Sequence, residues 1–290
     1  MPPTLQLTSE FPLFSKPDLL QLVLEHCDIK DLLALASTST TNAKRVRLYL
    51  RHRLNVICSP FFPCTVHLTD MLSACDAIVS GSAALRMLLP ANACNWSSSD
   101  LDIYVSFNSQ PQLYNLLRKH HYNIICEGRT NRNDYLPSTI FTVTTFGNGR
   151  KNIDIIMSRM SSALSPIFQF HSTAVMNFFT ADSLFCAYPS LTLHHCALIN
   201  TASLHNRTFP PSHMQALLKY KSHGFQFILS LNDNGWLSLD FATVPHRDTQ
   251  PVTTFYCLGI MDAVWTLGGH VCGSISLCVP PILHIINDNS

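Results

Sequence analysis

Apolar positions in the first 60 residues recur at helical spacing. Ser15-Lys-Pro-Asp18 has the residue types of a helix start, and leucines and valines then recur every three or four positions up to Cys27. Asp28-Ile-Lys-Asp31 repeats this signal before a second helix, and a basic third helix is expected at about 43–54. Three short helices bury little surface alone, so they need support from the rest of the chain or from a partner. We expect a small helical domain over residues 9–58.

Residues 65–200 mix helical and alternating periods. The pattern predicts helices at 66–74, 83–89 and 110–120, and strands at 77–79, 101–107, 139–146 and 151–157. Gly147-Asn-Gly149 joins the last two strands and is a strong hairpin turn. We therefore expect an α+β chain: the N-terminal helical unit, then an α/β domain with a mixed sheet over 65–200, then a β-rich tail.

The last third of the chain is less regular. Residues 167–188 fit a helix followed by strands, although periodicity alone does not decide, and 212–224 fits a helix ended by glycine. Short β-rich runs follow, so 201–290 is expected to be a C-terminal extension. The stretch 263–286 has no charged residue and is long enough to cross a bilayer. Its glycines, two histidines and Pro280-Pro281 favour buried strands instead.

Composition narrows the class of protein. Hydrophobic residues make up 47% of the 290 residues and charged residues only 13%, which excludes a disordered chain. A net charge of +1 gives no clear nucleic-acid-binding face in the totals. Eleven cysteines without a C-x-x-C pair indicate reduced thiols rather than a disulfide framework or zinc finger.

The N-terminus lacks the features of a signal peptide. We expect a cytoplasmic or nuclear protein with no membrane partner.

Three aspartates stand on predicted strands behind a Gly-Ser pair. Asp100 and Asp102 are two apart in one strand, so they point to the same face, about 7 Å apart. Asp154 lies among apolar residues, where a lone charge costs free energy unless it is paired or binds a cation. Converging carboxylates raise one another's pKa unless a metal neutralises them, and hard oxygen ligands suit Mg²⁺. Gly81 and Ser82 lie between a strand and a helix, where backbone N–H groups can hold a phosphate.

These residues resemble the nucleotidyltransferase fold typified by DNA polymerase beta. The matching features are Gly81-Ser82 after an apolar strand, Asp100-Leu-Asp102 at the start of the next, and Asp154 after the hairpin, over roughly residues 65–190. The resemblance implies that Gly81 and Ser82 contact the triphosphate of an NTP substrate. It also implies that the three aspartates are catalytic and hold Mg²⁺, with Mn²⁺ as a substitute, and that Asp154 helps to deprotonate the attacking hydroxyl.

The N-terminal pattern resembles an F-box. Residues 15–36 (SKPDLLQLVLEHCDIKDLLALA) carry the acidic-Leu-Leu start and the Asp-Leu-x-x-Leu of that family, with Ser15-Lys16 in place of its usual Leu-Pro pair. The resemblance implies docking to a Skp-type adaptor of an SCF-type ubiquitin ligase through residues 14–36. The alternative is a generic three-helix cap on the next domain. The whole layout resembles fungal F-box-like proteins that carry a nucleotidyltransferase-fold domain.

Two hypotheses for function follow. In the first, the chain transfers a nucleotide from an NTP to an unidentified acceptor and the N-terminal helices target it. In the second, it is an inactive F-box substrate receptor that uses the nucleotidyltransferase fold to bind protein. Weaker signals are five cations that could neutralise phosphates or be solvated surface charges, and a His-His-Cys run that could bind metal or be structural. The five cations are Arg129, Arg132, Arg150, Lys151 and Arg159, and the His-His-Cys run is His194 to Cys196. No G-x-S-x-G motif supports a hydrolase.

Overall fold

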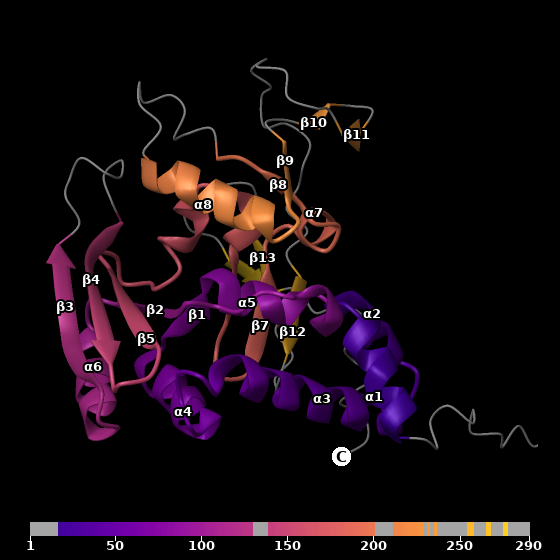
Figure 1. The fold of residues 1–290 in the computed structure, drawn as a ribbon, viewed down its shortest axis with the longest axis horizontal. Coiled ribbons are helices and arrows are strands. Elements are labelled where there is room, and N and C mark those ends of the chain that lie inside the picture. Colours follow the sequence, from indigo (N-terminus) through magenta and orange to yellow (C-terminus); the bar gives the residue numbers. More distant parts are fainter. Residues whose placement is uncertain are drawn as a thin grey trace, which may run out of the picture.

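The computed structural model describes residues 17–129, 139–200 and 211–228. Beyond these it describes short strands at 231–232, 235–236, 254–257, 265–267 and 275–277 (Figure 1). The described part is a mixed α/β structure in which helices cover a mixed sheet, as the sequence predicts. Among the described residues, no helix is long and apolar enough to cross a membrane.

The N-terminal helices form where the capping signals place them. They are α1 (Pro17–His26), α2 (Ile29–Ala36) and α3 (Thr40–Cys58). Asp28 and Asp31 form a reciprocal capping box at α2, whereas Ser15 lies outside the described residues. Helix α3 is longer than predicted at both ends, because Ser39 caps its N-terminus and no proline interrupts it before Pro60.

The largest sheet among the described residues has eight strands, in the order β12 (Thr254–Cys257), β7 (Ser183–Cys186), β6 (Asn177–Phe179), β1 (Ile78–Ser80), β2 (Asp100–Ser106), β5 (Asn152–Ser158), β4 (Ile140–Gly147) and β3 (Asn123–Arg129). Within this sheet only β2 and β5 run parallel. The predicted hairpin β4–β5 is confirmed. Strand β3 was not predicted, because its sequence NIICEGR does not alternate. The elements from α4 to β5 are α4 (Thr65–Cys75), β1 (Ile78–Ser80), α5 (Gly81–Leu88), η2 (Ala91–Ala93), β2 (Asp100–Ser106), α6 (Gln110–Lys119), β3 (Asn123–Arg129), β4 (Ile140–Gly147) and β5 (Asn152–Ser158).

The segment 167–188 forms two short 3-10 turns and two strands rather than a longer helix. Helix α8 (Pro211–Ser222) lies as predicted. The pairing of β13 (Trp265–Leu267) with β14 (Ile275–Leu277) favours strands over a membrane helix within 263–286. The remaining elements are η3 (Ile167–Gln169), η4 (Thr173–Val175), β6 (Asn177–Phe179), β7 (Ser183–Cys186), α7 (Pro189–Thr192), β8 (Cys196–Leu198), α8 (Pro211–Ser222), β9 (Gln226–Ile228), β10 (Leu231–Asn232), β11 (Gly235–Trp236), β12 (Thr254–Cys257), β13 (Trp265–Leu267) and β14 (Ile275–Leu277).

One hydrophobic core joins the N-terminal helices to the sheet. Leu24 and Ile29 belong to the same buried cluster as Leu101 and Ile103 of β2. Buried Arg53 of α3 also donates hydrogen bonds to the carbonyl groups of Arg86 and Leu89 at the C-terminal end of α5. The helices thus receive from the sheet the support that their small size requires. A second cluster, which includes Tyr104 and Phe178, covers the other face of the sheet.

Candidate metal and phosphate site

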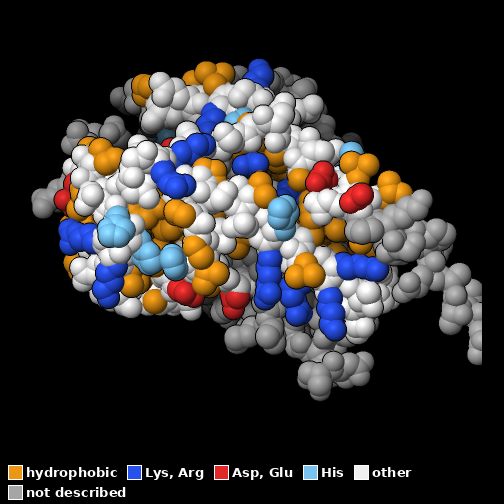
Figure 2. Space-filling model, turned by 60° about the horizontal axis from the view of Figure 1, so that its bottom comes forward, with side chains coloured by type: hydrophobic (Ala, Val, Ile, Leu, Met, Phe, Trp, Pro, Cys, Tyr) orange, Lys and Arg blue, Asp and Glu red, His pale blue; other side chains and the backbone are white. Residues whose placement is uncertain are grey.

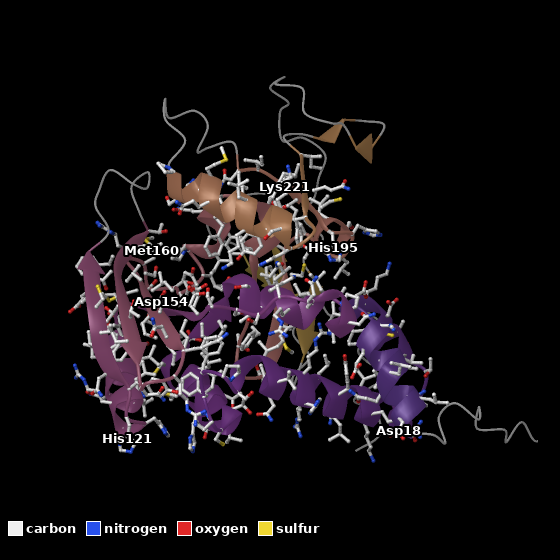
Figure 3. All side chains as sticks on the ribbon, in the orientation of Figure 1. Asp18, His121, Asp154, Met160, His195 and Lys221 are labelled. Carbon is white, nitrogen blue, oxygen red and sulfur yellow. The ribbon has the colours of Figure 1, made fainter. Side chains whose placement is uncertain are left out.

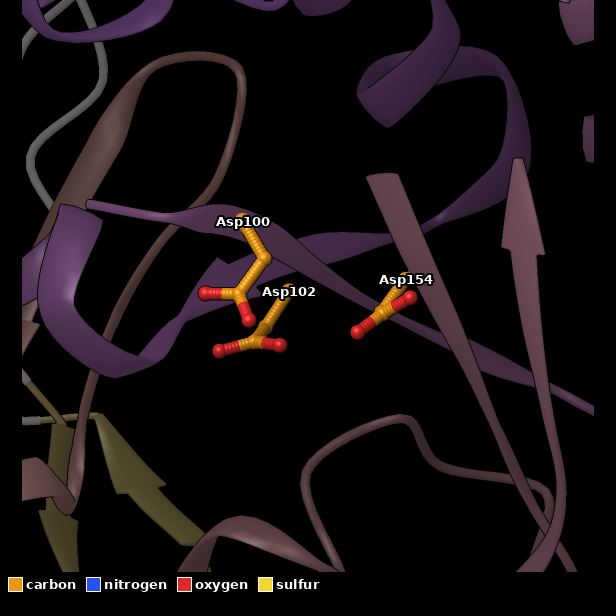
Figure 4. Close-up of side chains that lie close together, drawn as sticks. All are labelled: Asp100, Asp102 and Asp154. Atoms are coloured by element: carbon orange, nitrogen blue, oxygen red, sulfur yellow. The ribbon is translucent and has the colours of Figure 1, made fainter. Parts of the chain in front are cut away.

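The three predicted aspartates come together on adjacent parallel strands. Asp100 and Asp102 project from the same face of β2, and Asp102 is the register partner of Asp154 in β5. One carboxylate oxygen from each residue lies within 4.8 Å of the others (Figure 4). Figure 3 places Asp154 between the sheet and α8. All three side chains are partly buried.

Burial and mutual repulsion make this cluster electrostatically unfavourable. Burial first, and then the negative charges of Asp100 and Asp154, raise the pKa of Asp102 to about 7. Burial also raises the pKa of Asp154, although its Oδ1 atom accepts a hydrogen bond from the Thr145 hydroxyl at 2.6 Å. A bound cation would remove this repulsion.

The carboxylates therefore fit a hard divalent cation. Three carboxylate oxygens that lie close together and are partly shielded from water suit Mg²⁺ or Mn²⁺ better than they suit soft transition metals, which prefer sulfur and nitrogen ligands. Among the described residues, this triad is the one group of three or more His, Cys, Asp or Glu side chains with metal-ligand spacing. The run from His194 to Cys196 is not part of such a group.

Gly81 brings the start of a helix against the carboxylates. It is the first residue of α5 rather than part of a separate turn, and its φ of +67° is in the left-handed region. A Cβ atom at this position would overlap Asp102 Oδ2, so the site requires glycine for two reasons. The adjacent Ser80 is fixed by a 2.6 Å hydrogen bond from its hydroxyl to the carbonyl oxygen of Asn177. Ser82 is buried, and its hydroxyl shares a hydrogen bond with Tyr220.

Helix α8 supplies site residues that the sequence did not indicate. The positive charge of Lys219 lowers the pKa of Asp102, opposing the other effects on that carboxyl. Tyr220 is buried beside the cluster, where burial first and the charge of Asp102 second raise the pKa of its phenol. His171 stacks on Tyr220 with ring centroids 5.8 Å apart. The pattern at 212–224 predicts the helix but carries no local signal of what it covers.

The basic residues named from the sequence make other contacts. Lys151 Nζ donates to the carbonyl oxygen of Ser98 at 2.5 Å, and Arg159 Nε donates to that of Ile140 at 3.1 Å. Arg150 is exposed, and Arg132 lies outside the described residues, as does the side chain of Arg129.

Comparison of the chain with protein-family models, curated proteins and solved structures found no match.

Proposed function

We propose that this protein is a divalent-metal-dependent nucleotidyltransferase that moves a nucleotide from an NTP to an acceptor hydroxyl. The observation that supports it best is the convergence of Asp100, Asp102 and Asp154 beside the N-terminal end of α5. Carboxylates that share a cation next to free helix N–H groups suit a substrate that carries both Mg²⁺ and phosphate. The F-box-like helices at 9–58 would target the enzyme.

Each residue at the site has a physical role in this proposal. Asp100, Asp102 and Asp154 would hold Mg²⁺, which when bound offsets phosphate charge and polarises phosphoryl oxygens. The backbone at Gly81 and Ser82 would contact the triphosphate, because these residues begin α5 directly beside the Asp102 carboxylate. Lys219 would add a positive charge to the same site.

The proton of the acceptor hydroxyl would pass to Asp154. Asp154 lies in the same cluster as Asp100 and Asp102, and the Thr145 hydroxyl, which donates to its Oδ1 atom, holds this carboxylate in place. The acceptor oxygen would then form a bond to the α-phosphorus while pyrophosphate leaves with the electrons of the broken P–O bond.

Ligand-dependent stability tests this proposal. We would measure thermal unfolding with each NTP and Mg²⁺, with each NTP in EDTA, and in the Asp100→Asn/Asp102→Asn variant. A ligand at a hundredfold excess over its Kd stabilises the folded state by about 2.7 kcal/mol. We expect a metal-dependent increase that the double variant loses and that an Asp70→Asn control on α4 keeps. The absence of a shift with any nucleotide would contradict nucleotide transfer.

A second candidate function is that of an F-box substrate receptor, and the surface of α1 favours it. Leu24 and Leu20 are buried in the core, whereas Leu19, Leu22 and Val23 are exposed on the other side of the same helix. Leu22 is 55% exposed, which is unusual in a helix with an apolar face already buried. An exposed apolar stripe within 14–36 suits an adaptor protein. The two functions are compatible.

Adaptor docking is testable with purified components. We would measure binding of the full chain to a Skp-type adaptor by calorimetry, with Leu19→Ser/Leu22→Ser as the variant and Leu218→Ser on exposed α8 as the control. Saturable binding that only the α1 variant loses would support the receptor function. Absence of binding by the unaltered chain would exclude it.

A further inference from the structure

Helix α3 concentrates positive charge that the composition of the whole chain conceals. It carries Lys44, Arg45, Arg47, Arg51 and Arg53 among 19 residues and no acidic residue, whereas the net charge of the chain is only +1. Arg53 is buried, and Arg45 donates to Asn42 Oδ1 at 3.1 Å. The other three cations remain on the outer side of the helix.

Lys44, Arg47 and Arg51 form a stripe along two turns. At 100° per residue they lie within a narrow arc, and 44 and 51 are about 10 Å apart along the axis. Lys44 and Arg51 are exposed, and Arg47 is partly exposed. Figure 2 shows Lys and Arg side chains gathered over this helix, on the underside of the molecule. Helix α3 itself has no acidic residue, and the neighbouring helix α4 has the exposed acids Asp70 and, at its C-cap, Asp76.

We propose that this α3 stripe binds the phosphate backbone of a nucleic acid. Phosphates along one strand repeat about every 3.4 Å of helix axis, so the stripe spans roughly three of them. Two of its three cations are arginines, whose planar guanidinium groups bind phosphate oxygens in pairs. An anionic membrane is a poorer fit, because exposed His52 and Asn55 separate the two exposed apolar residues, Leu48 and Val56.

The stripe is separate from the aspartate cluster. Helix α3 packs into the core on one face of the sheet, and α8 lies on the other side of the sheet (Figure 1). Asp100 and Asp102 project toward α8, where the charge of Lys219 lowers the pKa of Asp102. Binding of nucleic acid by α3 would therefore be an activity additional to nucleotide transfer, and it does not depend on the proposed nucleotidyltransferase function.

Fluorescence anisotropy with a labelled 20-nucleotide single-stranded RNA and a DNA duplex tests this surface. With three phosphate contacts, log K for the single strand falls with log salt at a slope of about −2, a loss of about 20-fold between 50 and 200 mM KCl. We expect Lys44→Gln/Arg47→Gln/Arg51→Gln to weaken binding at 50 mM at least tenfold. We expect Asp100→Asn/Asp102→Asn to leave it unchanged.

A matched variant removes the same charge elsewhere. Arg118→Gln/Lys119→Gln/Arg150→Gln takes three exposed cations from α6 and the β4–β5 turn, and we expect it to retain binding. Glutamine has nearly the helix propensity of lysine and arginine, so we expect both triple variants to fold. Thermal unfolding of each variant checks this. Equal losses in the two variants, no binding of either nucleic acid at 50 mM, equal binding of poly-glutamate, or binding only to phosphatidylserine vesicles would each overturn the proposal.

Discussion

Asp102 and Asp154 are register partners across the parallel strands β2 and β5, so their side chains leave the sheet on the same face. Two like charges in this position are destabilising in a sheet unless something compensates them. Asp100, one pleat away on β2, adds a third negative charge. Lys219 compensates only in part, since the pKa of Asp102 remains raised to about 7. The arrangement therefore favours uptake of protons or of a cation.

The first prediction concerns pH. Because the pKa of Asp102 is higher in the folded state than in the unfolded state, the folded protein binds the proton more tightly. In EDTA, the free energy of unfolding should therefore fall as pH rises from about 4 to 7, by at most about 4 kcal/mol. Urea unfolding across this range should show a flatter profile for Asp102→Asn. An unchanged profile, equal to that of the Asp70→Asn control, would contradict the prediction.

The second prediction separates close contact from backbone strain at Gly81. Gly81 and Gly149 both have positive φ, but a Cβ at Gly81 would overlap Asp102 Oδ2 while a Cβ at Gly149 would meet no atom within 4 Å. Gly149→Ala should cost about 1 kcal/mol of strain. Gly81→Ala should cost about 1–3 kcal/mol more, as overpacking does, and should displace the Asp102 carboxylate.

Urea unfolding and Mn²⁺ titration check this pair. We expect weaker Mn²⁺ binding for Gly81→Ala and no change for Gly149→Ala. Equal destabilisation of the two variants, with Mn²⁺ affinity preserved in both, would show that the carboxylate does not depend on the missing side chain.

The third prediction concerns how α6 is held on the sheet. The buried Tyr114 hydroxyl donates to Thr144 Oγ1 of β4 at 2.5 Å. Tyr114→Phe should destabilise the protein by about 1 kcal/mol, because it leaves the buried threonine hydroxyl without its donor. A double-mutant cycle with Thr144→Val should show that the two losses are not additive. Additive losses would mean that the hydrogen bond contributes nothing to stability.

Local signals in the sequence predict most of the elements that carry the site. The two-residue spacing of Asp100 and Asp102, and the Gly147-Asn-Gly149 turn before Asp154, specify strand faces and a hairpin. The capping residue Asp28 likewise marks a helix start that the structure contains, whereas the cap at Ser39 was not predicted, since the third helix was expected from residue 43. In each case the information lies within a few residues of the element.

Long-range relationships could not be predicted in this way. Nothing near Lys219 or Tyr220 indicates that α8 reaches Asp102, more than a hundred residues earlier in the chain. The strand β3 is an edge strand without regular alternation, so periodicity misses it. Strands β6 and β7 within 167–188 lie inside the sheet and are buried on both faces, because Phe178 belongs to one apolar cluster and Phe179 to the other. Both sets of positions are therefore apolar, and no alternation marks the strands.

The last prediction tests the role of α8 at the site. Lys219→Gln removes the positive charge that lowers the pKa of Asp102, so that carboxyl should retain its proton to higher pH. Because a protonated carboxyl is a poor ligand, the pH at which Mn²⁺ binding is half-maximal should rise. Lys221→Gln, which removes an exposed charge from the same helix, should leave this pH unchanged. Mn²⁺ titrations between pH 5 and 8 compare the two variants. If Lys219→Gln lowers the midpoint, or if both variants shift it equally, then Lys219 does not act on Asp102 through its charge.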